Sequence, residues 1–273
     1  MTLTEAETEA PTLNLLGGPH VVVAGRRVPV PEGSKRLVAF VALNGRCVDR
    51  RQAATTLWPD VEAHRAAGNL RSAMWRLRVA DLRVLHADTC SLSLHPTLSV
   101  DLEGVRAWAD RLVAGKPEAE DLNLRAVALH ALDLLPGWYD DWVLLERERL
   151  RHLLLQAIDA LAQLLVLADR PGDAVEAALT AVSVEPLRES AQRALIDAHL
   201  AEGNRCEAWR SFGTYRDLLE SELGIAPPAE LARIFEQWPT RERPTERLRA
   251  ALAGRQPAGR RSELTARCRA LPA

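Results

Sequence analysis

Small apolar residues recur 34 positions apart in the second half of the chain. The matching pairs are Ala157 with Ala191, Leu161 with Leu195 and Ala174 with Ala208, and looser pairs are Leu164 with Ala198 and Ala181 with Tyr215. A period of 34 residues is typical of helix–turn–helix repeats, in which small residues stand where two helices cross. One repeat cannot bury its apolar face alone, so neighbouring repeats stack and form a concave surface. The sequence therefore predicts stacked helical hairpins of the tetratricopeptide type.

Helix breakers divide this half of the chain where such repeats require turns. They lie at 170–172, 185–186, 203–204 and 224–228. Apolar residues at helical spacing predict further helices, namely 102–114, 122–135 and 142–167 before the repeats and a capping helix over 231–238. In the first of these the inward positions are Val105, Trp108, Ala109 and Leu112. Residues 101–238 are thus expected to form one all-α domain.

The preceding segment, 12–100, has a different pattern. Short apolar runs separated by Gly and Pro predict an antiparallel meander over 12–31. Helical spacing follows over about 34–43, 50–57 and 63–79, with Ser34 and Asp49 as N-caps of the first two helices. Short β-like runs then stand at 84–85, 91–94 and 98–100. A meander, three helices and a hairpin form a winged helix, a helix-turn-helix variant whose third helix enters the DNA major groove.

The predicted third helix has two unlike faces. Its apolar stripe consists of Ala66, Leu70, Ala73, Met74 and Leu77. The other side carries Arg65, Asn69, Ser72, Trp75 and Arg76, with Arg71 and Arg78 on the flank. No acidic residue stands between Glu62 and Asp81. Such a helix is equally typical of a solvated surface when taken alone, but its place as the third helix favours DNA recognition.

The roles on this helix follow from side-chain chemistry. Arg, Asn and Ser side chains form hydrogen bonds with base edges, and Arg also binds phosphates. We expect Asn69, Ser72 and Arg76 to face bases. Arg65, Arg71 and Arg78 are expected to face phosphates, and Trp75 is placed with them, although it would also suit a bridge to the helical domain.

Charge is distributed unevenly although the net charge is only −2. Residues 12–100 carry 12 Lys and Arg against 6 Asp and Glu, and residues 101–238 carry 14 against 25. The final segment, 239–273, has 9 Arg against 3 Glu and little apolar periodicity. The basic first part suits an anion such as DNA. Residues 239–273 and 1–11 are expected to be disordered, with a weak non-specific grip on DNA as a lesser role for the tail.

Signatures of catalysis and of metal or cofactor binding are missing from the sequence. It contains no P-loop, no dinucleotide-binding fingerprint, no nucleophile elbow and no zinc-protease motif. The closely spaced Glu146 and Glu148 each precede an Arg by three residues, which indicates ion pairs on a helix surface. We therefore expect no enzyme, no cofactor and no metal.

The same sequence also bears on location. Scattered cysteines without CxxC spacing argue against a disulfide scaffold or a zinc site, and Cys47 and Cys206 are expected to be small core residues. The acidic N-terminus is no signal peptide, and polar residues interrupt the apolar run 153–168. These features predict a cytoplasmic protein without a membrane span.

Several motifs, in order, carry a resemblance to a known family. They are Ala66-Ala-Gly-Asn-Leu-Arg-Ser-Ala-Met-Trp-Arg-Leu-Arg78, Leu135-Pro-Gly-Trp-Tyr-Asp-Asp-Trp142, Glu146-Arg-Glu-Arg-Leu150, Glu185-Pro-Leu-Arg-Glu189, Cys206-Glu-Ala208 and Tyr215-Arg-Asp-Leu-Leu-Glu-Ser-Glu-Leu-Gly-Ile225. Together they make residues 12–238 resemble the Streptomyces antibiotic regulatory proteins, with a winged helix before a bacterial transcriptional activator domain. The chain departs from this family in lacking an aromatic Gly-Tyr pair in the wing region 86–99, and no nucleotide-binding module follows the helical domain.

The resemblance implies a transcriptional activator that binds double-stranded promoter DNA. Such proteins bind direct repeats near the −35 region and recruit RNA polymerase holoenzyme, here for a secondary-metabolite (antibiotic) gene cluster, so the protein would be nucleoid-associated. Self-association on direct repeats would be head-to-tail. The residues implied to face polymerase and sigma factor form the loop before the third helix, Trp58, Pro59, Asp60, Val61 and Glu62.

A second hypothesis comes from the acidic helical half. Its repeat groove could bind a basic protein partner, with a degenerate first domain that binds no specific DNA. Specific retardation of promoter DNA in the presence of competitor would discriminate the two functions.

Overall fold

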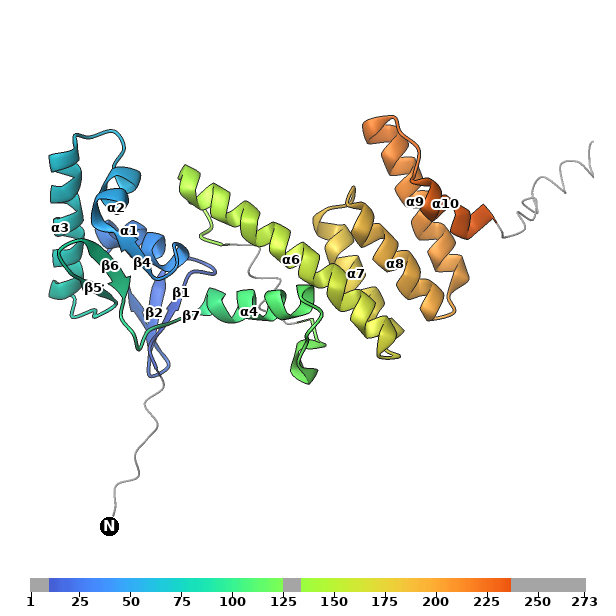
Figure 1. Ribbon diagram of the computed structural model, residues 1–273, viewed down its shortest axis with the longest axis horizontal. Coiled ribbons are helices and arrows are strands. Elements are labelled where there is room, and N and C mark those ends of the chain that lie inside the picture. Colours follow the sequence, from blue (N-terminus) through green and yellow to red (C-terminus); the bar gives the residue numbers. More distant parts are fainter. Residues whose placement is uncertain (1–9, 125–133, 237–273) are drawn as a thin grey trace, which may run out of the picture. The chain divides into compact units, whose positions relative to one another are not determined.

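The computed structural model describes residues 10–124 and 134–236. The chain begins with the expected meander, formed by β1 (Thr12–Asn14), β2 (His20–Val23) and β3 (Arg26–Pro29), which pair antiparallel in sequence order (Figure 1). A later strand, β7 (Ser99–Val100), pairs parallel with β1 and completes the sheet order β3-β2-β1-β7. The register places Leu13 between Val21 and Val100, and all three side chains are buried. The first sheet therefore joins the start of the chain to the end of the winged helix.

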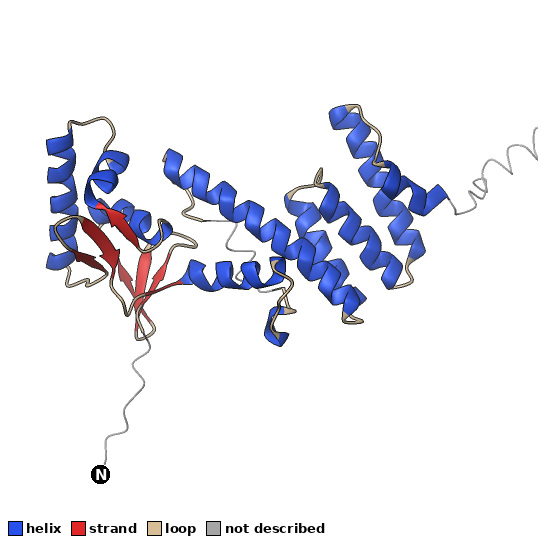
Figure 2. Cartoon of the chain, in the orientation of Figure 1, coloured by secondary structure: helices blue, strands red, loops and turns tan. Residues whose placement is uncertain are grey.

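Three helices and a second sheet make up the rest of this part. The helices are α1 (Glu32–Leu43), α2 (Arg50–Leu57) and α3 (Ala63–Val79). The second sheet has the order β4-β6-β5 and contains β4 (Cys47–Asp49), β5 (Leu85–Ala87) and β6 (Ser91–Leu94). Strands β5 and β6 form the wing hairpin (Figure 2). Strand β4 was absent from the sequence prediction because three residues between two helices carry no periodicity of their own.

The two predicted N-caps have different outcomes. Asp49 caps α2, since its carboxylate accepts hydrogen bonds from the backbone N–H groups of Arg51 and Gln52. The prediction for Ser34 is wrong, because α1 begins two residues earlier, after Pro31. Ser34 lies inside α1 and is fully buried, and its hydroxyl donates to the carbonyl of Ala73 in α3 at 2.8 Å. The residue thus joins two helices, which only their packing could reveal.

The prediction of core cysteines is also wrong. Cys47 and Cys206 are exposed, and so is Cys90. Cys47 flanks the buried Val48 in β4, and neighbouring residues of a strand point to opposite faces. Cys206 lies in the first turn of α9 (Arg205–Leu223), two residues before the buried Ala208. Residue type suggested burial, but local geometry turned both thiols outward.

Helices alone follow β7. They are α4 (Asp101–Val113), the 3-10 turn η1 (Ala119–Asp121), α6 (Asp141–Leu167), α7 (Pro171–Val184), α8 (Glu189–Ala201) and α9. From α6 to α9 each helix packs against the next, as Figure 1 shows. The paired positions of the 34-residue repeat are buried at the crossings, with Ala157, Ala191, Ala174 and Ala208 at 0% exposure. The repeat prediction is confirmed.

Two expected helices fall partly outside the described residues. Most of the helix predicted over 122–135 lies on residues 125–133, and the predicted capping helix 231–238 corresponds to α10 (Ala229–Glu236), after which the description ends. The described residues from Pro227 to Glu236, which contain α10, belong to a separate unit. The tail 239–273 and residues 1–9 also lie outside the described ranges.

Among the described residues, α6 is the helix that by length and composition could cross a membrane. Half of its most apolar stretch is buried inside the protein, where α6 packs against α4, α7 and α8. Its Asp159 accepts hydrogen bonds from Arg188 and Ser190. These contacts are those of the central helix of a repeat stack.

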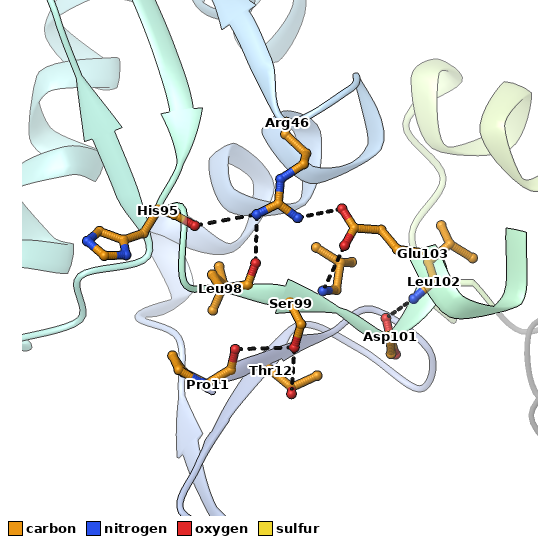
Figure 3. A network of polar contacts seen from close by, with 10 residues as sticks. Pro11, Thr12, Arg46, His95, Leu98, Ser99, Asp101, Leu102 and Glu103 are labelled. Atoms are coloured by element: carbon orange, nitrogen blue, oxygen red, sulfur yellow. Dashed lines mark hydrogen bonds and ion pairs between the residues drawn. The ribbon is translucent and has the colours of Figure 1, made fainter. Parts of the chain in front are cut away.

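A polar network joins the winged helix to the start of α4 (Figure 3). Arg46, in left-handed backbone conformation at φ 68°, donates to the carbonyl of Leu98 at 2.7 Å and pairs with Glu103 at 2.5 Å. Asp101, the first residue of α4, accepts the backbone N–H groups of Leu15 and Leu16 at 3.0 Å. Burial raises the pKa of the Asp101 carboxyl. The network fastens the first turn of the helical part to the winged helix.

Candidate nucleic-acid interface

Helix α3 has the bounds and the buried stripe that the sequence predicts. It begins at Ala63 and ends at Val79, and its buried residues are Ala66, Leu70, Ala73, Met74 and Leu77. These side chains pack towards α1 and α2, which leaves the opposite face to solvent. Arg76 and Arg78 lie in the last turn, where a positive charge interacts favourably with the helix dipole. Packing therefore presents one face of α3 outward.

The predicted contact residues gather on that outward side. Arg65, Arg71, Ser72, Trp75, Arg76 and Arg78 are exposed, and Asn69 is half-buried. Within the described part of the chain, none of the four arginines of α3 makes an ion pair or a side-chain hydrogen bond with protein. Four guanidinium groups without carboxylate partners keep their forks of N–H donors available, and such donors suit an anion.

Arg76 occupies the edge of this surface that faces α1. A Cβ atom built on Gly33, in the first turn of α1, would lie 2.9 Å from an Nη atom of Arg76. The guanidinium therefore rests directly on the Gly33 backbone. Asn69 stands seven residues before Arg76 and so lies on the same edge of the helix. Two of the three predicted base-contacting residues, Asn69 and Arg76, thus flank the face, whereas the third, Ser72, lies closer to its centre.

Trp75 is 63% exposed, so its side chain does not form the contact with the helical part that the sequence analysis gave as an alternative. Val79 is 66% exposed and lies one turn further along the same face. Sequence reasoning treated Val79 only as the end of the helix. The spacing of four residues from Trp75 was the signal that could have identified it.

The wing adds a groove beside the C-terminal half of α3. This groove has a volume of about 410 Å³ and an apolar floor that includes Met74, Leu77 and Leu85. Its rim carries Arg78, Arg83, His86 and His95, together with Asp81. The sequence prediction placed no contact residue after Arg78, because rim residues of a short hairpin carry no periodic signal.

The tip of the wing is held by Asp88. Its carboxylate accepts hydrogen bonds from the hydroxyl of Ser91 at 2.7 Å, the backbone N–H of Ser91 at 2.6 Å and that of Cys90 at 2.7 Å. The bonds from Ser91, followed by that from Cys90, lower the pKa of Asp88 to about 2. Arg50 of α2 donates to the Asp88 carbonyl at 2.8 Å, which ties the turn to the helices. The wing is therefore a braced hairpin.

The loop between α2 and α3 contains the residues expected to face polymerase. Pro59, Asp60, Val61 and Glu62 are exposed, and Trp58 is half-buried. The loop forms one wall of a cleft of about 630 Å³, whose other residues include Arg36 and the segment from Tyr139 to Trp142. Arg36 pairs with Asp140 across it.

An aromatic contact also joins α1 to Trp142, which lines this cleft. The rings of Phe40 in α1 and Trp142 in α6 meet edge to face at 5.3 Å. The loop is thus presented next to the first turn of α6.

Residues 10–124 and 134–236 contain no group of three His, Cys, Asp or Glu side chains placed to hold a metal ion. The carboxylates Glu146 and Glu148 make the predicted ion pairs with Arg149 and Arg151, and Glu146 also binds Arg106.

Comparison with known proteins shows a family match, a curated relative and a similar solved structure. The family described as bacterial transcriptional activator domain matches residues 99–238. The regulatory protein AfsR of Streptomyces griseus is 26% identical over 226 residues, which cover 76% of this chain and 22% of that protein. The chain thus spans about a fifth of the length of this curated relative.

The third match is structural. Mycobacterium tuberculosis EmbR, solved in complex with a low-affinity phosphopeptide, aligns with a TM-score of 0.58 and 20% sequence identity, over 90% of this chain and 69% of the EmbR chain. This likeness supports the arrangement of a winged helix before a helical domain.

Proposed function

Because this chain belongs to the bacterial transcriptional activator domain family and is a regulator of the Streptomyces antibiotic regulatory protein type, we propose that it activates transcription by binding specific promoter DNA through α3. One observation carries the proposal. The outward face of α3 presents four arginines that have no acidic partner among the described residues, in the recognition position of a winged helix.

The positions of the side chains on this face support separate roles in contacting bases and phosphates. Asn69, Ser72 and Arg76 are proposed to contact bases, and Arg65, Arg71 and Arg78 to contact phosphates. Arg76 reaches a base only if its guanidinium leaves Gly33, which is a rotation of an exposed, flexible side chain. The groove between α3 and the wing gives the sugar-phosphate backbone a place beside Arg78 and Arg83.

The family supports a wider proposal for promoter architecture. The protein binds direct repeats near the −35 region and recruits RNA polymerase through the exposed loop of residues 58–62, at the promoters of a secondary-metabolite cluster. Copies on successive repeats stand head-to-tail, since direct repeats have no two-fold axis. Activators of this family act in the cytoplasm, and this one is proposed to associate with the nucleoid.

A gel-shift assay with promoter DNA from adjacent genes tests the proposal. With excess competitor DNA, the full chain should give a specific band that Arg71→Ala/Arg78→Ala weakens. The matched control is Arg210→Ala/Arg216→Ala, which removes two exposed arginines from α9 that are paired with Glu207 and Asp217. Equal weakening by both variants, or salt-labile binding to any DNA, would contradict specific recognition and favour a protein-binding scaffold.

A further inference from the structure

Four residues of α3 form a line along the centre of its outward face. Gly68, Ser72, Trp75 and Val79 are spaced by four, three and four residues, which places them above one another opposite the buried stripe. We call this line the outer ridge. Its N-terminal half is low, because Gly68 and Ser72 have small side chains, and its C-terminal half is tall and apolar. Trp75 and Val79 are 63% and 66% exposed.

The fold does not explain the two apolar residues. They are neighbours on the helix surface, and no described side chain covers them. Phosphate contact, the role that the sequence analysis assigned to Trp75, would use only its indole N–H, and Val79 has no donor, so the apolar surface of the pair would remain unused. An apolar pair at the centre of an interface instead requires an apolar partner.

The fold does not explain Gly68 either. Glycine weakens a helix interior, yet a Cβ atom built on Gly68 would meet only an Nη atom of Arg71, at 3.7 Å. Alanine would therefore fit within the protein. A missing side chain at the centre of the outward face permits close approach of the α3 backbone to whatever binds there.

We propose that the outer ridge reads thymine in the major groove, with the C5-methyl groups of thymine packed against Trp75 and Val79. The inference rests on the proposed DNA-binding function and names what α3 recognises. In the major groove, the thymine methyl is the one apolar group on the base edges. Gly68 and Ser72 let the N-terminal half of α3 approach the bases, and Arg71 and Arg78 flank the ridge where phosphates lie.

Charge decides against a second copy of the chain as the occupant. In a two-fold contact the same patch meets itself, so the unpaired Arg71 and Arg78 of one copy would face those of the other. Like charges at close range oppose that contact. A polyanion that also carries methyl groups satisfies both features of the surface.

The test combines removal of thymine methyl groups from the DNA with removal of the Trp75 or Val79 side chain from the protein. The full chain first selects its site from a library of random duplexes. Each thymine of the selected site is then replaced in turn by deoxyuridine, which keeps the base pair and removes only the methyl group. We expect one or two positions at which uracil weakens binding about fourfold, as for burial of one methyl-sized group.

The decisive readout is the coupling between the two changes. In Trp75→Ala or Val79→Ala, uracil at the matching position should weaken binding no further. The control is Val113→Ala, which removes an exposed valine from α4 and should keep the full uracil effect. Both ridge residues are exposed, so thermal melting of the variants should match that of the parent protein, and either variant alone suffices.

Three results would overturn the inference. Specific binding that is indifferent to uracil at every position refutes methyl reading but leaves the proposed function standing. A library that yields no preferred sequence refutes both. If Trp75→Ala weakens self-association in sedimentation without DNA, while uracil has no effect, the outer ridge is an interface between copies.

Discussion

Arginine serves two purposes in two regions of this protein. In the helical part, Arg111 donates to both carboxylate oxygens of the buried Asp121 at 2.6 and 2.7 Å, and Arg188 donates to Asp159 at 2.9 Å. Arg147 donates to the carbonyls of Leu134 and Leu135. In α3, by contrast, the described structure gives the arginines no acceptor. The same residue type therefore stabilises the fold in one region and remains available to a ligand in the other.

The difference shows that a binding surface is indicated by charged side chains that lack a partner within the protein, rather than by the number of charged residues. Many acidic side chains of the helical part form ion pairs within the protein; Glu146, for example, pairs with both Arg106 and Arg149. Part of the acidic charge of residues 101–238 is thus neutralised within the fold. The four arginines of α3, by contrast, have no acidic partner among the described residues.

The largest effect is expected from an arginine of the helical part. Arg188→Ala should lower the free energy of unfolding by about 3–5 kcal/mol, because it leaves the largely buried carboxylate of Asp159 without its cation. Urea unfolding measures this change. Arg71→Ala is the matched variant on α3 and should change stability by less than about 0.5 kcal/mol. Equal destabilisation by both variants would remove the distinction between the two regions.

The next effect concerns sequence-specific DNA binding. Arg76→Ala should weaken binding to the specific site by about 1–3 kcal/mol and leave non-specific DNA unaffected, as expected for a base contact. Competition titration against both DNAs measures the difference. Unchanged promoter affinity would show that Arg76 remains on Gly33 in the complex and reads no base.

A smaller effect is expected from the flanking arginines. Arg71→Ala and Arg78→Ala should each weaken binding to all sequences alike and reduce the salt dependence by about one unit of slope, because one phosphate contact is lost. Binding measured over a range of salt concentrations gives the slope. Arg216→Ala, in α9, should leave it unchanged, and a variant of α3 with an unaltered slope makes no phosphate contact.

The smallest effect is on the wing. The pKa of Asp88 is about 2, below the usual 3.8, because the carboxylate accepts hydrogen bonds from Ser91 and Cys90. These bonds stabilise the turn fully at pH values above about 4, and the stabilisation is lost as the pH falls from about 4 towards 2. Ser91→Ala removes the strongest of these bonds and should raise the pKa of Asp88 towards the usual value. An NMR titration of the carboxyl carbon measures it. An unchanged titration would mean that the backbone bonds alone hold the carboxylate.

Sequence periodicity predicted α3 well. Its bounds and its five buried residues agree with the prediction, because a helix of 17 residues carries nearly five turns of apolar pattern. The repeat positions Ala157 and Ala191 agree for the same reason. The strand β4 and the inward place of Ser34 escaped prediction, since three residues make no period and a buried hydroxyl depends on a partner helix.

The amino-acid sequence by itself determined which face of α3 is apolar, where the repeats cross and how charge is divided along the chain, because all three are local or periodic properties. Only the tertiary structure decided which arginines are free. The sequence does not distinguish Arg188 from Arg71, since both are arginines in or beside a helix. Folding brings the carboxylate of Asp159, 29 residues away in the chain, to Arg188, and it brings no carboxylate to Arg71. It also laid Arg76 on Gly33 and left Trp75 and Val79 uncovered. Contacts between residues distant in the chain depend on packing, and no period in the sequence encodes them.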